Sequence, residues 1–326
     1  MMKRCILPII LCLLLALTAC GRVKESPAYA PQETAAVTAP PLSKGAETES
    51  VIAGSFMADT DGTLYTTFPG TAGDAVYLYD ILPQDTGYVY VFIPSGGTVY
   101  AVVRTDFMTL DSAQLCAYDT ADGSCTVLAD DCSGISKLIL AGDTLYYEGA
   151  EGGIYSIDVS SGKAETAIAD ALSLFGADGG FLYYTRDDGC VYRNDSKLDS
   201  EFTVLSDYSS LLFFCSSDSI CNVSYMQDSG GSIPVLQFRD ASGSLKTQQV
   251  LSADVTGLCQ QGGVVYAVLP ADGELVGYSL ADGSEVSRIS LPDAEELLTL
   301  LYVSDTQVYY TTLQDGVETV TCAAIG

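Results

Sequence analysis

The stretch from Phe181 to Asp195 reads FLYYTRDDGCVYRND and contains two strand-like runs on either side of one turn. The first run, Phe181–Thr185, is apolar and aromatic, as in a strand that is buried on both faces. The pair Asp188-Gly189 supplies the positive φ angle that a tight turn needs. A second run starts at Val191, so this stretch is predicted to form a β-hairpin.

Related hairpins recur along the chain from Val51 onward. Each of seven units has an anchor tyrosine in its second strand-like run, and neighbouring anchors are 35 to 47 residues apart. The anchors are Tyr65, Tyr100, Tyr147, Tyr184, Tyr225, Tyr266 and Tyr310. A repeat of about 40 residues made of four short strands is typical of a β-propeller blade. We therefore predict an all-β fold, a β-propeller of about seven four-stranded blades, with six or eight blades as alternatives.

The hairpin sequence resembles the YWTD-type propeller repeat, with Tyr184 at the position where that family has tryptophan. The fragments Leu145–Tyr147 and Val308–Tyr310 resemble it too. The resemblance implies a closed ring, usually of six blades. The anchor tyrosines are expected to pack between blades rather than to bind a ligand. Because the last repeat has only three predicted strands, a strand from Glu49–Ala58 or from the segment before it is expected to complete the last blade.

The N-terminus has the features of an export signal. Lys3 and Arg4 precede a run of 12 residues, Ile6–Leu17, that is apolar but too short to span a bilayer comfortably. The closing residues Leu17-Thr18-Ala19-Cys20 resemble a bacterial lipobox, which implies cleavage before Cys20 and attachment of lipid to its sulfur. An uncleaved anchor or an ordinary secretory signal is the alternative.

The domain organisation follows from these features. Residues 1–19 are predicted to be the signal peptide, and residues 20–50 a tether that starts at the lipidated cysteine and is rich in Pro, Ala and Thr. Residues 51–326 are predicted to be the propeller. The expected localisation is extracytoplasmic, anchored by lipid to the bacterial cell membrane.

Composition excludes several function classes. The chain has 14 basic and 42 acidic residues, a formal charge of −28, and no histidine. Such a charge repels nucleic acids, so no nucleic-acid partner is expected. The lack of histidine excludes Ser-His-Asp and Cys-His catalysis and all His-ligated metal sites. We predict no cofactor and no metal. The aspartates of Asp59-Thr60-Asp61-Gly62 are expected to form a turn, because the calcium-loop pattern around them is incomplete.

Eight cysteines lie in the predicted propeller, an even number that permits disulfides outside the cell. Two pairs flank predicted turns, Cys116 with Cys125 and Cys215 with Cys221, and these are the candidate disulfides. Buried free thiols are the alternative.

The loops that connect second strands to third strands, together with the connections between blades, are expected to form the binding face. The candidate binding residues on these loops are Arg104, Asp106, Phe107, Glu148, Arg186, Asp187 and Asp272. Since no catalytic motif is found, the predicted function is a non-enzymatic binding or scaffold module for a protein, peptide or glycan. The alternative is a polysaccharide hydrolase or lyase that uses paired carboxylates in the central funnel. The protein is expected to be a monomer.

Overall fold

The computed structural model describes residues 50–324 with short gaps. The gaps are residues 53, 60, 72–74, 105–112, 131, 133–136, 150–151, 179–180, 196–200, 207–212, 217, 229–230, 252–254, 256, 292–296, 305 and 315. The predicted signal peptide, Cys20 and nearly all of the tether therefore lie outside the described residues. In the described part of the chain, no helix is long and apolar enough to cross a membrane.

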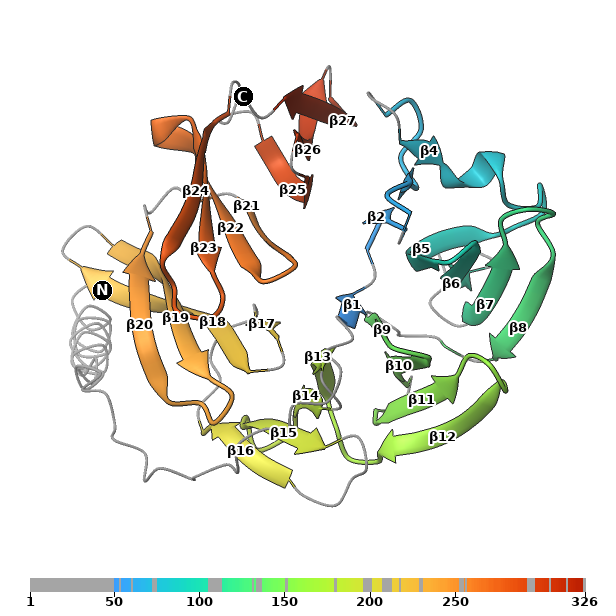
Figure 1. Ribbon diagram of the computed structural model, residues 1–326, viewed down its shortest axis with the longest axis horizontal. Helices are drawn as coiled ribbons and strands as arrows, with labels where there is room; N and C mark the ends of the chain where they lie inside the picture. Colours follow the sequence, from blue (N-terminus) through green and yellow to red (C-terminus); the bar gives the residue numbers. More distant parts are fainter. Residues whose placement is uncertain are drawn as a thin grey trace, which may run out of the picture. The chain divides into compact units, whose positions relative to one another are not determined.

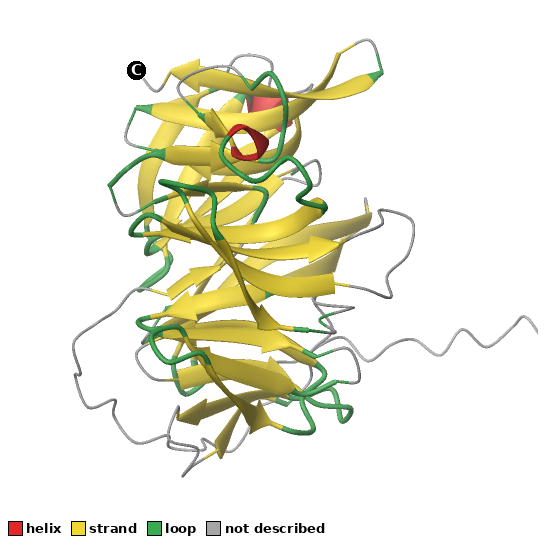
Figure 2. Ribbon diagram, turned by 90° about the vertical axis from the view of Figure 1, so that its right-hand side faces the viewer, coloured by secondary structure: helices red, strands yellow, loops and turns green. Residues whose placement is uncertain are grey.

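The strands form seven sheets arranged as the blades of a ring, which confirms the predicted β-propeller (Figure 1). Almost all of the described chain lies in strands and the turns between them, as the side view shows (Figure 2). Two 3-10 turns, η1 (Leu78–Asp80) and η2 (Pro270–Asp272), are the described exceptions.

Each blade is a run of consecutive strands. Blade 1 contains β2 (Phe56–Ala58), β3 (Leu64–Thr66) and β4 (Val76–Tyr77). Blade 2 contains β5 (Tyr88–Ser95), β6 (Thr98–Arg104), β7 (Ala113–Asp119) and β8 (Cys125–Ala129). Blade 3 contains β9 (Leu138–Ala141), β10 (Thr144–Glu148), β11 (Ile154–Asp158) and β12 (Lys163–Ile168), with β1 (Ser50–Ile52) added at its inner edge.

The remaining blades follow in order. Blade 4 contains β13 (Ser173–Asp178), β14 (Phe181–Thr185), β15 (Val191–Asp195) and β16 (Glu201–Leu205). Blade 5 contains β17 (Phe213–Cys215), β18 (Ser219–Asp228), β19 (Gly231–Asp240) and β20 (Leu245–Val250). Blade 6 contains β21 (Gly257–Gln261), β22 (Val264–Leu269), β23 (Glu274–Ser279) and β24 (Glu285–Ser290). Blade 7 contains β25 (Leu297–Val303), β26 (Gln307–Gln314) and β27 (Val317–Ala324).

The prediction that Glu49–Ala58 completes the last blade is wrong. Within this segment, β1 pairs antiparallel with β9 at the centre of the ring, and Gly54 pairs with Phe92 of β5. The segment therefore satisfies backbone groups on the inner edges of blades 3 and 2, which would otherwise face the central channel without a strand partner. Blade 7 has three strands among the described residues.

The core consists of seven apolar clusters, each shared by two neighbouring blades. Blades bury both faces in this way, because a single blade has no core of its own. The cluster that joins blade 7 to blade 1 is the smallest, with only Phe56, Tyr309 and Val320 fully buried among the described residues. The ring is therefore closed by side-chain packing at its thinnest interface.

The anchor tyrosines mostly pack between blades, as predicted. Six of the seven belong to, or pack against, these clusters. The exception is Tyr225, which is exposed. In blade 4, the buried Tyr184 lies opposite Leu174 of the first strand. The equivalent residue of blade 5 is Asn222, which lies opposite Phe213 and is three residues before Tyr225. Tyr225 lies instead opposite Pro234 at the rim of the blade, where β18 begins to extend beyond the body of the blade.

Candidate functional site

The turns from second to third strands lie at one face of the ring, and two of the hairpins there are longer than their neighbours. Strands β18 and β26 have ten and eight residues, whereas β22 has six and β14 has five. Strands β18 and β22 begin at the same level of the ring, at the end away from these turns. This is shown by equivalent backbone hydrogen bonds next to their first residues, from Ala241 N to Asp218 O and from Leu280 N to Gly263 O. At about 3.4 Å per residue, β18 therefore continues about 13 Å beyond β22.

The tips of these hairpins expose large apolar side chains. Tyr225 is 59% exposed and Met226 41% exposed on β18. Leu313 on β26 is 57% exposed, and Val317 on β27 is 62% exposed. Sequence analysis placed both turns on the binding face but did not select these residues, because apolar side chains in strand-like runs were expected to be buried.

Two candidate binding residues at this face, Arg104 and Glu148, already contact other groups of the protein. The guanidinium carbon of Arg104 lies 4.3 Å from the centre of the Tyr90 ring, and the Arg104 side chain is buried. Glu148 Oε1 accepts hydrogen bonds from Ser173 Oγ at 2.9 Å and from Leu174 N at 2.5 Å. Glu148 thus holds the start of β13 against the end of β10 and joins blade 3 to blade 4.

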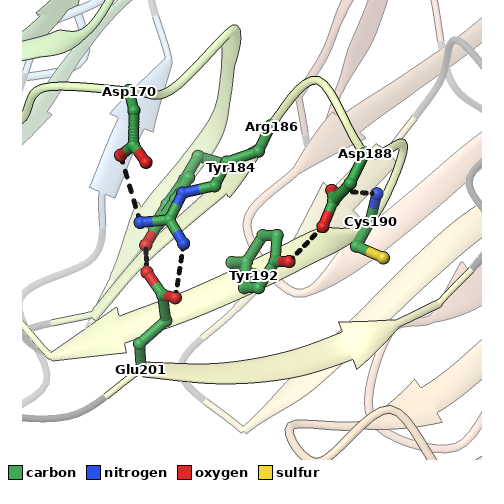
Figure 3. A network of polar contacts seen from close by, with 7 residues as sticks. All are labelled: Asp170, Tyr184, Arg186, Asp188, Cys190, Tyr192 and Glu201. Carbon is green, nitrogen blue, oxygen red and sulfur yellow. Dashed lines mark hydrogen bonds and ion pairs between the residues drawn. The ribbon is translucent and has the colours of Figure 1, made fainter.

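Arg186 is also held by its own chain (Figure 3). Its Nη2 lies 3.1 Å from Asp170 Oδ1, and its Nη1 donates to Glu201 Oε1 at 2.6 Å. The Tyr184 hydroxyl donates to the other oxygen of Glu201. The guanidinium carbon of Arg186 lies 4.8 Å from the centre of the Tyr192 ring. Two carboxylates and an aromatic face thus surround this cation, and it has little capacity left for an anionic ligand.

The same network keeps two phenols protonated. Burial, followed by the hydrogen bond to Glu201, raises the pKa of Tyr184. The hydrogen bond that Tyr192 donates to Asp188 Oδ2, 2.5 Å long, raises the pKa of Tyr192 to about 12 and lowers that of Asp188. Neither phenol is therefore a general base near neutral pH.

Of the four remaining candidate binding residues, two are exposed and two lie outside the described residues. Asp187 and Asp272 are exposed at the turns of blades 4 and 6. Asp106 and Phe107 lie outside the described residues. The structure brings Glu148 and Arg186 to the same junction of blades 3 and 4, whereas Arg104 and Asp272 belong to other blades.

Among the described carboxylic acids, none has a pKa that is clearly raised. Glycoside hydrolysis needs an acid whose pKa is raised. Each described Asp or Glu whose pKa departs clearly from its ordinary value is shifted downward, mostly because turn N–H, hydroxyl or guanidinium groups donate to it.

No group of three potential metal ligands occurs among the described side chains. Asp59 instead links blade 1 to blade 2, since its Oδ1 accepts from Gly96 N at 2.8 Å. Asp61 Oδ1 accepts from Thr63 N at 2.8 Å within the same turn. The pair forms the turn that the sequence predicted.

The two candidate disulfides differ in their geometry. Cys215 lies opposite Ile220 and Cys221 opposite Phe214, so the two cysteines point to opposite faces of the sheet. A disulfide between them would require a shift of one residue in strand register, and this prediction is therefore wrong. Cys116 and Cys125 carry free thiols on the same face, with Cys125 opposite Tyr118. Their disulfide stays a prediction.

Comparisons with known proteins support the fold. No protein-family model matches the sequence, and no curated protein matches it. Among solved structures, Hsv2 of Kluyveromyces marxianus is similar with a TM-score of 0.50 and 13% identity, over 85% of this chain and 96% of that one. An acylaminoacyl peptidase of Pyrococcus horikoshii is similar with a TM-score of 0.51 and 12% identity, over 72% of this chain but only 44% of that one. At such low identity, these similarities show a common fold and nothing about activity.

Proposed function

We propose that this protein is a lipid-anchored, extracytoplasmic β-propeller that acts as a binding module rather than as an enzyme. Its partner is a protein, a peptide or a glycan, and the ring binds it through the face that carries the second-to-third-strand turns. The tether of about 30 residues would span roughly 30 Å as a flexible coil, enough to hold the ring clear of the lipid headgroups.

One observation carries the binding role. The paired strands in the hairpins of blades 5 and 7 are longer than those of blades 4 and 6, and their tips expose Tyr225, Met226, Leu313 and Val317. Exposed apolar side chains that serve no internal packing are typical of an interface. Arg104, Glu148 and Arg186 already contact other groups of the protein. This favours the apolar surface over a charged pocket as the place where a partner binds.

The lipid anchor rests on the residues Leu17-Thr18-Ala19-Cys20 and on the apolar run before them. Its test is metabolic labelling with an alkyne-bearing palmitate in a bacterial host. The wild-type chain and a Cys12→Ala variant should both incorporate label, because Cys12 lies in the segment expected to be removed. Cys20→Ala should not. Equal labelling of Cys20→Ala and wild type would refute the anchor.

The binding role is tested with the full chain in detergent, immobilised and exposed separately to a peptide library and to a glycan array. Saturable binding of either ligand class that is lost when the protein is unfolded supports a binding module. Turnover of a polysaccharide by the purified chain would refute it, because the product would then require a catalytic centre.

A further inference from the structure

The two long hairpins flank a blade whose corresponding turn is short. Blade 6 lies between blades 5 and 7 and turns from β22 to β23 through η2. In blade 5, a backbone hydrogen bond from Leu251 N to Pro234 O marks the rim of the blade. In blade 6, the equivalent hydrogen bond runs from Leu291 N to Gly273 O. Residues 226–228 and 231–233 therefore project beyond the rim of blade 6.

Both faces of each hairpin tip carry an exposed apolar side chain. Tyr225 and Met226 are consecutive in β18, so they point to opposite faces of that hairpin. Leu313 lies opposite Glu318, and Val317 lies opposite Gln314, which puts Leu313 and Val317 on opposite faces of the second hairpin. Cys221 and Val223 pack against blade 6, so Tyr225 lies on the face of its hairpin that is turned toward blade 6. Val308 and Tyr310 also pack against blade 6, so Val317, opposite Gln314, lies on that face, whereas Leu313 lies on the face turned toward blade 1.

The sequence of blades 6 and 7 is strongly acidic. From Gly257 to Gly326 the sequence has ten acidic residues and a single basic one, Arg288. Arg288 is neutralised by Glu274 and by Glu285, the latter at 2.7 Å. Asp272 at the turn of blade 6 and Glu318 on β27 are exposed. A cationic partner would therefore be attracted to this side of the ring, and an anionic lipid or polymer would be repelled.

We propose that the twin-hairpin surface, defined as Tyr225, Asp272 and Val317, binds a basic polypeptide segment with aliphatic or aromatic side chains. The two apolar side chains would contact the side chains of that segment, and Asp272 would lie near its lysines or arginines. An aliphatic group such as Val317 suits apolar peptide side chains better than it suits the hydroxyl-rich faces of a sugar. The inference rests on the proposed binding role and names its ligand class and its place.

The test is selection of a random 12-residue peptide library on the full chain in detergent. The selected peptides should be rich in Lys and Arg together with Leu, Ile, Phe or Tyr. The double variant Tyr225→Ser/Val317→Ser should bind them at least about tenfold more weakly, as expected when interface anchors are truncated. Val286→Ser, which removes a 54% exposed apolar side chain from β24 of blade 6, is the matched control and should bind like wild type.

A second variant tests the electrostatic part of the proposal. Asp272→Asn should weaken binding less than the double variant does and should reduce the dependence of the affinity on salt concentration. All variants change exposed residues, so their melting temperatures should match that of wild type within about 2 °C.

The outcomes separate this inference from the wider proposal. Selected peptides that are neutral or acidic, or that bind the double variant within twofold of wild type, would overturn the twin-hairpin surface while leaving a binding module in place. Binding of glycans that is lost in the double variant would overturn the ligand class. A chain that binds neither peptides nor glycans would overturn both proposals.

Discussion

Replacing Phe56 by alanine should weaken the closure of the ring more than any other single truncation in blade 1. Phe56 is only 3% exposed, and its ring centre lies 4.6 Å from that of Tyr309 and 6.0 Å from that of Tyr302. It is the one fully buried residue that blade 1 contributes to the cluster shared with blade 7 in the described part of the chain. Among the described strands, none of one blade pairs with a strand of the other, so these side chains hold the two ends together.

The expected loss can be worked out from this packing. A buried Phe→Ala change costs about 3–5 kcal/mol, through lost transfer free energy and the cavity that remains. The two ring contacts fall within the range of distances at which aromatic pairs add stability, which favours the upper part of that range. For a domain of this size, about 2 °C is lost per kcal/mol, so the melting temperature should fall by roughly 6–10 °C.

Hydrogen exchange distinguishes an opened ring from a general loss of stability. In Phe56→Ala, faster exchange should be confined to β2, β3 and β25–β27. The matched variant Phe238→Ala removes an equally buried ring from the cluster between blades 5 and 6. It should leave those strands protected and affect β18–β24 instead. If both variants exchange faster over the same strands, or if Phe56→Ala melts within 2 °C of wild type, the closure argument fails.

Three further predictions concern stability and reactivity. Hydrogen bonds that Asp158 accepts from the turn that follows it lower its pKa to about 2. Because this folded-state pKa lies below the unfolded one, the stabilisation is present above about pH 4 and is lost as the pH falls toward 2. Over that pH range, the melting temperature should therefore fall less steeply for Asp158→Asn than for wild type. Gly243→Ala should cost at least about 1 kcal/mol in urea unfolding, because Gly243 has a φ of +88° and an added Cβ would lie 1.9 Å from Val204 O; an unchanged midpoint would contradict this. Burial raises the pKa of Cys259 to about 12, so in the fully reduced protein a thiol reagent at pH 8 should modify the exposed Cys125 in the folded state and Cys259 only after unfolding.

Local hairpins were the most predictable part of this fold. The runs expected around Asp188-Gly189 are observed as β14 and β15, because period-two patterning and turn residues act over a few neighbouring positions. Tyr225 shows where this reasoning fails. Its run looked like the other anchor strands, but β18 extends past the body of the blade, and strand length depends on its pairing with β19.

The candidate binding residues illustrate a second limit. Arg186 was chosen as a charged residue in a turn, and the structure does place it at the predicted face. Its partners are Asp170, in the connection before β13 and 16 residues away, and Glu201, at the start of β16 and 15 residues away, and together they neutralise it. A sequence shows that a side chain can be charged at a face, but whether that charge is free depends on which distant groups the fold brings within 4 Å.

By itself, the sequence determined the fold class and the repeat, because each blade encodes its own strands and turns at a regular spacing. It also determined the formal charge of −28 and the lack of histidine. Only the tertiary structure decided that Ser50–Ile52 pairs at the centre of the ring, that Phe56 closes it, and that two hairpins stand above blade 6. These features depend on contacts between residues far apart in the chain, whose free energies no local pattern records.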